Sequence, residues 1–291
     1  MGSLDGRVAI ITGAGRGIGR EHALYFAAEG AKVVVNDLGG ANDGTGADLS
    51  PAQQVVEEIK ASGGEAVVNG DDVASWEGAQ RMINQAIETF GDLDILVNNA
   101  GILRDRVLVN MTEQEWDAVI AVHLKGHFAP TRWAAAYWRE QHKAGISKPR
   151  NLVHTSSTSG LFANPGQANY GAAKTGIATF SQIIAKELVR YGVKSNTIAP
   201  GARTRLTLAT PGLENIMKPR EGSFDPWDPA NISPLVAYLA TADCAFTGET
   251  FLVQGGSVTL VESWQRGAGV ERDSKWTVTE LADALAPLTR S

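Results

Sequence analysis

The sequence predicts a single α/β domain built on a doubly wound parallel sheet with helices on both faces. Short β-rich runs alternate with helical patterns from residue 7 to residue 254, which is the order that a parallel sheet requires. The first run leads into a glycine-rich turn and then into a helix, as in mononucleotide-binding units. A chain of 291 residues with 43% hydrophobic and 20% charged residues is typical of one globular enzyme domain.

The first strand, 7–12, ends in Thr12-Gly-Ala-Gly-Arg-Gly-Ile-Gly19, and a helix follows through residue 29. Glycines in such a turn let the backbone approach a pyrophosphate, and the helix N-terminus supplies positive dipole. A lone glycine turn is weak evidence, but here a second strand, 32–38, follows where the βαβ unit requires it. We therefore expect five residues to contact a dinucleotide: Gly13, Arg16, Gly17, Ile18 and Gly19.

Asp37 ends the second strand, about 20 residues past the turn, where a carboxylate accepts both adenosine ribose hydroxyls and repels a 2′-phosphate. Asp37 therefore favours NAD over NADP. Two alternatives stay open: Asp37 merely begins a polar loop, or Arg16 in the turn serves a 2′-phosphate. We weight Asp37 more heavily because its charge would lie within a few ångströms of that phosphate.

The next elements continue the alternation. A Gly- and Asp-rich loop (39–50), a helix opened by proline (51–61), a strand (65–69), a helix (76–90) and a strand (93–97) follow in order. Ligands of such sheets bind at the carboxyl ends of the strands. There the carboxylate of Asp72, beside Val73, is placed to accept from an adenine amino group, and the run Asn98-Asn99-Ala100-Gly101 follows the fourth strand.

Tyr170 and Lys174 are four residues apart, so on a helix they share one face. A neighbouring ammonium favours the phenolate form of tyrosine, whose usual pKa is about 10. Ser157 ends an apolar strand (151–157), where its hydroxyl can donate to a carbonyl or alcohol oxygen. On spacing alone an ordinary amphipathic helix turn is the more common explanation. The upstream nucleotide-binding unit favours an acid/base site.

Together, these motifs resemble the short-chain dehydrogenase/reductase family over roughly residues 5 to 258. The resemblance implies a Rossmann-type fold, Tyr170 as general acid/base, Lys174 as the residue that lowers its pKa and holds the nicotinamide ribose, and Ser157 as the residue that orients the substrate oxygen. It also implies that Asn98 supports the central strand. The remaining cofactor contacts that the resemblance implies, around the loop after strand 194–198 and the motif after the fourth strand, are Asn99, Ala100, Gly101, Ile198, Pro200, Gly201 and Thr204.

One position departs from the family pattern. Many members carry an asparagine on the helix before the catalytic strand as part of a proton relay with the lysine, and alignment of 121–126 puts His123 there. Histidine can also bridge a water to the lysine, but it titrates near neutral pH. His123 and His127 have metal-pair spacing without an obvious third ligand, so we expect no metal.

Several runs narrow the resemblance. Residues 35–40, 99–106, 122–126 and 166–170 are similar to the D-3-hydroxyacyl-CoA dehydrogenase part of peroxisomal multifunctional enzymes of type two, a branch that includes hydroxysteroid dehydrogenases. This implies NAD-dependent oxidation of a secondary alcohol, with an acyl thioester or a steroid-like molecule as the substrate, and a homodimer or homotetramer. A 3-oxoacyl-carrier-protein reductase, a hydroxysteroid dehydrogenase and a silent dinucleotide sensor or scaffold are the alternatives.

After the catalytic helix (175–190), the chain carries a proline-punctuated segment, 211–234, which is either a substrate lid or an ordinary surface excursion. A helix from residue 233 and a strand, 250–254, are expected to complete the sheet. We place the catalytic domain at 1–260 and a C-terminal extension, helical near 278–288, at 261–291.

Composition excludes other classes. A net charge of −6 and a pI near 5.4 argue against binding nucleic acid or anionic membrane by bulk charge. The single cysteine, Cys244, excludes an internal disulfide framework and fits a reducing compartment. No apolar run reaches the 18 or so residues of a membrane span, and we expect no signal peptide, because the first strand begins too early to leave room for one. We expect a cytoplasmic protein.

Overall fold

The computed structural model describes residues 2–208, 212–219 and 222–288. The chain forms two compact units that meet in sequence between Val261 and Glu262, and each is described separately. Within the described ranges, no helix combines the length and apolar character needed to cross a bilayer.

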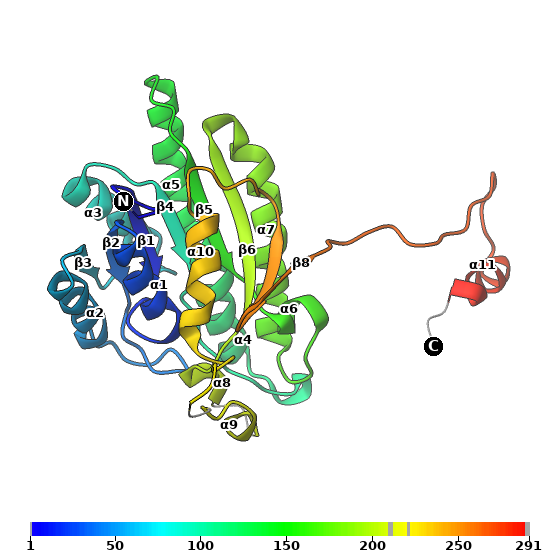
Figure 1. Ribbon diagram of the computed structural model, residues 1–291. Helices are drawn as coiled ribbons and strands as arrows, with labels where there is room; N and C mark the ends of the chain where they lie inside the picture. Colours follow the sequence, from blue (N-terminus) through cyan, green and yellow to red (C-terminus); the bar gives the residue numbers. More distant parts are fainter. Residues whose placement is uncertain (1, 209–211, 220–221, 289–291) are drawn as a thin grey trace. The chain divides into compact units, whose positions relative to one another are not determined.

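The first unit is built around an eight-stranded sheet with the order β3-β2-β1-β4-β5-β6-β7-β8 (Figure 1). Neighbouring strands are parallel except for β7 and β8, which are antiparallel. The strands are β1 (Val8–Thr12), β2 (Lys32–Asn36), β3 (Glu65–Asn69), β4 (Ile95–Asn98), β5 (Arg150–Thr155), β6 (Val193–Gly201), β7 (Thr250–Gln254) and β8 (Ser257–Val261). This confirms the predicted doubly wound α/β fold.

Helices cover both faces of the sheet, and each face has its own core. On one face lie α1 (Gly17–Ala28), α2 (Ser50–Ala61) and α10 (Ser233–Leu239), and on the other lie α3 (Trp76–Phe90), α5 (Gly126–Lys143) and α7 (Ala168–Leu188). The central strands are buried on both sides, as parallel strands are. The smaller helical pieces are η1 (Leu108–Asn110), α4 (Glu113–Ile120), η2 (Ala121–Lys125), α6 (Thr158–Phe162), η3 (Val189–Tyr191), α8 (Arg205–Leu208), α9 (Leu213–Ile216) and η4 (Pro229–Ile232).

Local sequence explains where the long helices begin and end. In α3, the Ser75 hydroxyl accepts from the N–H of Gly78, and Gly91 ends the helix in the left-handed conformation. Pro51 lies in the first turn of α2. Helix α7 begins at Ala168, before the expected start at residue 175, so Tyr170 and Lys174 belong to its first two turns.

Strand β8 was not predicted from the sequence. Gly255, with φ of 53°, makes a tight turn with Gly256, so that Ser257 pairs with Gln254 and the chain runs back along β7. Val258 and Leu260 are about half exposed, at 52% and 50%. The run 257–260 does alternate polar and apolar residues, so this strand was missed although a short alternating pattern was present.

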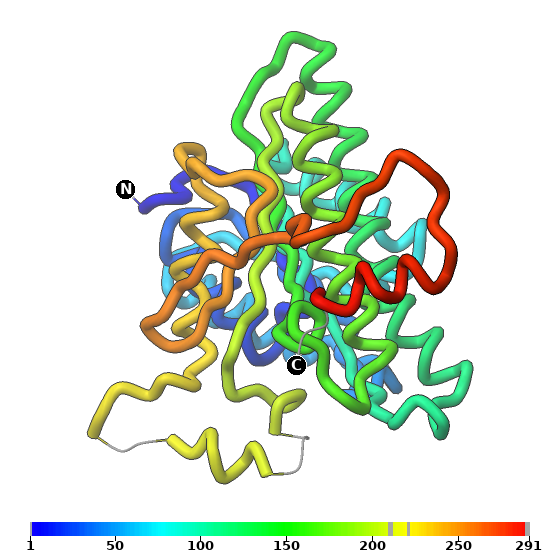
Figure 2. Tube along the Cα trace, turned by 90° about the vertical axis from the view of Figure 1, so that its right-hand side faces the viewer, coloured from blue at the N-terminus to red at the C-terminus, as the bar shows by residue number. Residues whose placement is uncertain are grey.

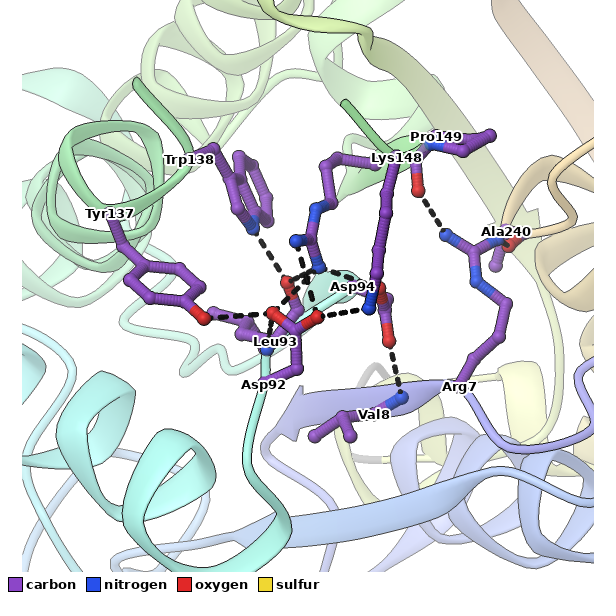
Figure 3. A network of polar contacts seen from close by, with 11 residues as sticks. Arg7, Val8, Asp92, Leu93, Asp94, Tyr137, Trp138, Lys148, Pro149 and Ala240 are labelled. Carbon is purple, nitrogen blue, oxygen red and sulfur yellow. Dashed lines mark hydrogen bonds and ion pairs between the residues drawn. The ribbon is translucent and has the colours of Figure 1, made fainter. Parts of the chain in front are cut away.

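A polar network fastens the N-terminal ends of β1, β4 and β5 (Figure 3). The buried guanidinium of Arg150 lies 2.5 Å from the Asp94 carboxylate and 2.9 Å from that of Asp92. Asp94 also accepts from the N–H of Val8 at 2.9 Å, and Tyr137 donates to Asp92 at 2.8 Å. Burial raises the pKa of the Asp92 carboxyl, but hydrogen bonds from Lys148, Arg150, the Leu93 N–H and Tyr137 outweigh it and lower the pKa to about 2. The network therefore links the three strands at the end of the sheet where they begin, opposite to their C-terminal ends.

The segment between β6 and α10 carries α8 and α9 and projects from the body of the unit (Figure 2). Arg203, just after β6, contacts later residues of this segment. Its guanidinium donates to the Met217 carbonyl at 2.8 Å and lies 2.6 Å from the Asp225 carboxylate. Of the lid-like stretch expected at 211–234, Pro211, Arg220 and Glu221 lie outside the described residues.

The second unit contains α11 (Val278–Leu285) and η5 (Ala286–Leu288). Thr277 and Glu280 form a reciprocal capping box at the start of α11. Arg272 pairs with Glu280 at 2.7 Å and lies over the Trp276 ring at 5.0 Å. Local contacts therefore account for the order in this unit.

Candidate active site

Two glycines of the turn between β1 and α1, Gly13 and Gly19, are packed too closely for a side chain. A Cβ on Gly13, whose φ is 65°, would lie 2.7 Å from the Ala100 Cα. A Cβ on Gly19 would lie 2.1 Å from the Gly13 carbonyl oxygen. α1 has no acidic residue in its first turn, so its N-terminal dipole is not offset there by a carboxylate. These features fit a dinucleotide pyrophosphate, which needs close approach to bare backbone.

The motif after β4 supports this turn. The Thr12 hydroxyl accepts from the N–H groups of Asn99 and Ala100 at 2.9 and 3.1 Å, and the Asn99 amide donates to the Thr12 carbonyl at 3.0 Å. Asn98 is buried and donates to Thr131 at 3.0 Å. The supporting role of Thr12 was missed in the sequence, where it was read only as the start of the turn.

Asp37 lies beside the glycine turn. Its carboxylate accepts from the N–H of Gly15 at 2.8 Å and from that of Gly39 at 2.6 Å. Arg205 is close enough for its charge to interact with both Arg16 and Asp37: burial and Arg16 lower the pKa of Arg205, and Asp37 opposes them. The Asp37 carboxylate therefore has oxygen lone pairs left for ribose hydroxyls, but the cation of Arg205 lies nearby.

The other expected cofactor contacts lie at C-terminal ends of strands. Asp72 is exposed and accepts from the N–H of Ala74 at 2.8 Å, and Val73 is buried. Thr204 approaches the turn, since a Cβ on Gly17 would lie 3.5 Å from its methyl group. Ile198, Pro200 and Gly201 form the end of β6, where the Ile198 carbonyl accepts from the N–H of Ser156 at 2.7 Å.

Ser157, Tyr170 and Lys174 come together from two elements. Ser157 caps the N-terminus of α6 immediately after β5, and Tyr170 and Lys174 lie on α7. The Ser157 hydroxyl hydrogen-bonds to the Tyr170 phenol, and the Lys174 Nζ lies 5.4 Å from the Tyr170 ring centroid. Lys174 is buried and donates to the Thr155 carbonyl at 2.6 Å. The structure thus brings the three predicted catalytic side chains into one constellation.

Burial opposes the charged forms of this pair. Desolvation raises the pKa of Tyr170 to about 12, with a smaller contribution in the same direction from Asp105, while the Ser157 hydrogen bond lowers it. Desolvation also lowers the pKa of Lys174 to about 7. The chain must therefore stabilise the Lys174 ammonium if that charge is to favour the Tyr170 phenolate.

His123 lies in the single π-helical turn η2, between α4 and α5. Its ring meets that of Tyr170 edge-on at 5.1 Å, and its Nε2 lies 2.8 Å from the Ile102 carbonyl oxygen. A Cβ on Gly101 would lie 2.5 Å from the His123 ring. Burial and the Lys174 charge hold the pKa of His123 well below its usual value, so the ring is neutral near pH 7. Among the residues described, no group of three potential ligands is arranged to hold a metal ion.

A second polar group next to Tyr170 was not anticipated. The Gln167 side chain, immediately before α7, donates to the Asp105 carboxylate at 2.7 Å, and Asn164 donates to the Gln167 carbonyl at 2.9 Å. Arg106 donates its N–H to the Gly166 carbonyl at 2.8 Å. The loop after β4 is thereby joined to the start of the catalytic helix, a contact that sequence spacing does not reveal.

Comparisons of the sequence with known proteins identify a family and several relatives. A model of the short chain dehydrogenase family matches residues 7–210. The chain is 44% identical over 294 residues to hydroxyacyl-CoA dehydrogenase ChsB1 of Mycobacterium tuberculosis. The matched region covers 97% of this chain and 88% of the relative. The chain is also 44% identical over 288 residues to peroxisomal multifunctional enzyme type 2 of Drosophila melanogaster, which covers 98% of this chain and 45% of that longer protein.

A solved structure extends the likeness to the whole fold. The crystal structure of a short chain dehydrogenase from Mycobacterium avium gives a TM-score of 0.89 at 52% identity, covering 99% of this chain and 96% of the other. The family model spans well over half of the sequence, and it includes the glycine turn and the Tyr170–Lys174 pair. The chain therefore belongs to the short-chain dehydrogenase/reductase family, oxidoreductases that act on CH–OH groups with a nicotinamide dinucleotide.

Proposed function

We propose that this oxidoreductase uses NAD to interconvert a 3-hydroxyacyl-CoA thioester and its 3-oxo form. The observation that carries the reaction type is the meeting of Ser157, Tyr170 and Lys174 on α6 and α7, at the sheet edge that carries the dinucleotide cradle. The substrate class is supported by 44% identity to a hydroxyacyl-CoA dehydrogenase over 88% of that protein's length.

In the oxidative direction, the substrate hydroxyl would hydrogen-bond to Ser157 and Tyr170, and the tyrosinate would take its proton. Bound NAD supplies the nicotinamide carbon that exchanges hydride with the carbinol carbon. Lys174 would hold the nicotinamide ribose and would stabilise the phenolate by its charge, while neutral His123 fixes the backbone after β4 through Ile102. Positioned proton transfer of this kind contributes about 10²–10⁴ in rate.

The preference for NAD over NADP is proposed from Asp37. A 2′-phosphate beside a carboxylate that is held by two backbone N–H groups would be repelled. We expect Asp37→Ala to raise kcat/KM with NADP and lower it with NAD. Arg16→Ala is the matched variant from the same turn and should change the ratio in the opposite direction or leave it unchanged. A wild-type enzyme that prefers NADP would contradict the proposal.

The substrate proposal is tested by a steady-state screen with NAD and NADP. Acyl-CoA, acyl-carrier-protein and hydroxysteroid substrates are compared at equal concentrations, because the alternatives share the chemistry and differ in the pocket. The proposal predicts the highest kcat/KM for 3-hydroxyacyl-CoA. A dominant 3-oxoacyl-carrier-protein or steroid activity would replace it, and absence of turnover with every alcohol would favour a dinucleotide sensor.

We also propose a cytoplasmic homodimer or homotetramer. A groove of about 610 Å³ between α5 and α7, with Phe128 43% exposed at its edge, supports an assembly through this face. The single buried cysteine fits a reducing compartment. Sedimentation measures the assembly state, and a monomer at micromolar concentration would contradict it. Cell fractionation tests the compartment.

A further inference from the structure

The loop 39–48, which follows β2 and which we call the strap, is closed at its base. Its two ends meet, because the N–H of Asp48 donates to the Leu38 carbonyl at 3.1 Å. Gly44 and Gly46 turn the chain between these ends with φ of 86° and 77°, a region in which other residues are strained. Compact surface loops of this length with joined ends are frequently functional. The glycine-rich sequence is therefore what the shape of the strap requires.

The base of the strap is tied to the glycine turn through one carboxylate. Asp37 accepts from the N–H of Gly39, the first residue of the strap, at 2.6 Å. The same side chain accepts from the N–H of Gly15 in the glycine turn at 2.8 Å. The strap and the dinucleotide cradle therefore start from a common fixed point.

Beyond its base, the strap contacts segments that follow β4 and β6. The Asn42 carbonyl accepts from the N–H of Leu103 at 3.0 Å. The Arg104 guanidinium donates to the Asp43 carbonyl at 2.8 Å. The Asn42 side chain donates to the carbonyl of Arg205, the first residue of α8, at 3.3 Å (Figure 1). Three hydrogen bonds thus hold the strap against two other loops of the same sheet edge.

The order of the strands places the glycine turn between the attachments of the strap. β1 lies between β2 and β4, and β6 lies two strands beyond β4. A loop that starts at β2 and contacts residues after β4 and β6 therefore crosses the C-terminal end of β1, where the glycine turn begins. The expected dinucleotide contacts span the same stretch of this edge, from Asp37 after β2 to Thr204 after β6.

The closed position of the strap is only weakly favoured. Asn42 Oδ1 is buried and has no hydrogen-bond partner among the described residues. An acceptor buried in this way is destabilising by an amount comparable to one of the hydrogen bonds that hold the strap. The strap can therefore open without disturbing the sheet beneath it.

We propose that the strap closes over the dinucleotide bound at the glycine turn, and that the cofactor enters and leaves only when the contacts of Asn42 and Asp43 open. Arg104 is a positioning residue that acts through the strap. Each oxidation ends with departure of the reduced cofactor, so opening of the strap is a step of every catalytic cycle. The proposal rests on the nicotinamide dinucleotide that the family binds, and on neither the NAD preference nor the acyl-CoA substrate.

The first test loosens the strap. Arg104→Met removes one closing contact and should raise both the association and the dissociation rate constants of the cofactor about tenfold, measured by stopped-flow fluorescence with NADH and NADPH. Loss of a direct cofactor contact would raise the dissociation rate constant alone. Arg106→Met is the matched control, because Arg106 pairs with Glu115 at 3.2 Å, and it should leave both rate constants unchanged. Unchanged rate constants in Arg104→Met, or a change in dissociation alone, would overturn the proposal.

The second test locks the strap. A Cβ on Gly44 would lie 3.9 Å from the Ile102 Cβ, which is a disulfide separation. Gly44→Cys combined with Ile102→Cys, loaded with NADH and then oxidised, should retain NADH through gel filtration and release it on reduction. The same protein oxidised while empty should not take up NADH until it is reduced. The native Cys244 is buried and does not compete for the new thiols.

Gly46→Cys combined with Ile102→Cys is the control for the lock. Gly46 has the same kind of backbone conformation, but its Cβ would have nothing within 4 Å, so oxidation should not change NADH release. Failure of the Gly44→Cys/Ile102→Cys disulfide to form, or equal NADH release before and after its reduction, would overturn the proposal. If 3-hydroxyacyl-CoA is not turned over, the proposed function fails while these binding measurements still decide the role of the strap.

Discussion

Replacing Arg150 with methionine removes the cation from the buried network at the N-terminal ends of β1, β4 and β5 while keeping most of the side-chain volume. The guanidinium is 2% exposed and lies 2.5 Å from Asp94. Without it, Asp94 keeps the N–H of Val8 but loses its ion pair. Leaving such a charge buried costs about 3–5 kcal/mol. At about 2–4 °C per kcal/mol in a domain of this size, the melting temperature should fall by roughly 10 °C.

The assay is thermal and urea unfolding followed by circular dichroism, with kcat measured at 25 °C in parallel. Turnover should stay close to the wild-type value, because the network is at the edge of the sheet opposite to the active site. Arg150→Met combined with Asp94→Asn should recover part of the loss, since the amide carbonyl can still accept from Val8. Lys143→Met, which breaks an exposed pair with Glu140, should cost less than about 0.5 kcal/mol. A loss below about 1 kcal/mol in Arg150→Met, or lost turnover in a folded variant, would refute this reasoning.

Two further predictions concern the cofactor turn and the phenol. Gly19→Ala should weaken dinucleotide binding at least tenfold by titration calorimetry, because its Cβ would meet the Gly13 carbonyl at 2.1 Å, whereas Gly256→Ala, with open space around it, should bind normally; equal affinities would contradict the packing of the turn. Asp105→Asn should move the ascending limb of kcat/KM for oxidation to lower pH, because the Asp105 charge raises the pKa of Tyr170 and its removal lowers that pKa. A limb that stays in place or moves upward would show that Asp105 does not act on the phenol.

The regular elements were predictable where a pattern was local. β3, α3 and β7 have the predicted bounds, because short apolar runs between polar residues mark the two strands and Ser75 and Gly91 mark the ends of the helix. β8 was missed although residues 257–260 alternate polar and apolar side chains, because neither face of this strand is buried and it is the antiparallel pairing with β7 that identifies it. The π-helical turn around His123 was not predicted either. His123 contacts the Ile102 carbonyl, which is 21 residues away in the chain, so a local pattern does not reveal this contact.

The meeting of Ser157, Tyr170 and Lys174 was predicted because ordered motifs mark it, but the electrostatics of these side chains were not. The spacing of Tyr170 and Lys174 shows that they share a helix face, yet it does not show that burial pushes both pKa values away from the charged forms. Asp105 and Gln167 meet through a fold contact between distant segments. The strap is likewise held by residues from the distant segments after β4 and β6, so no sequence window contains its contacts.

The role of Tyr170 as the acid/base is tested most directly by single-turnover oxidation of the preferred alcohol by Tyr170→Phe. The variant keeps the aromatic ring and removes the phenol hydroxyl. It should bind the dinucleotide with an affinity close to that of the wild type and oxidise the alcohol about 10²–10⁴-fold more slowly. A variant with near-wild-type turnover would contradict the assignment of Tyr170 and, with it, the proposed mechanism.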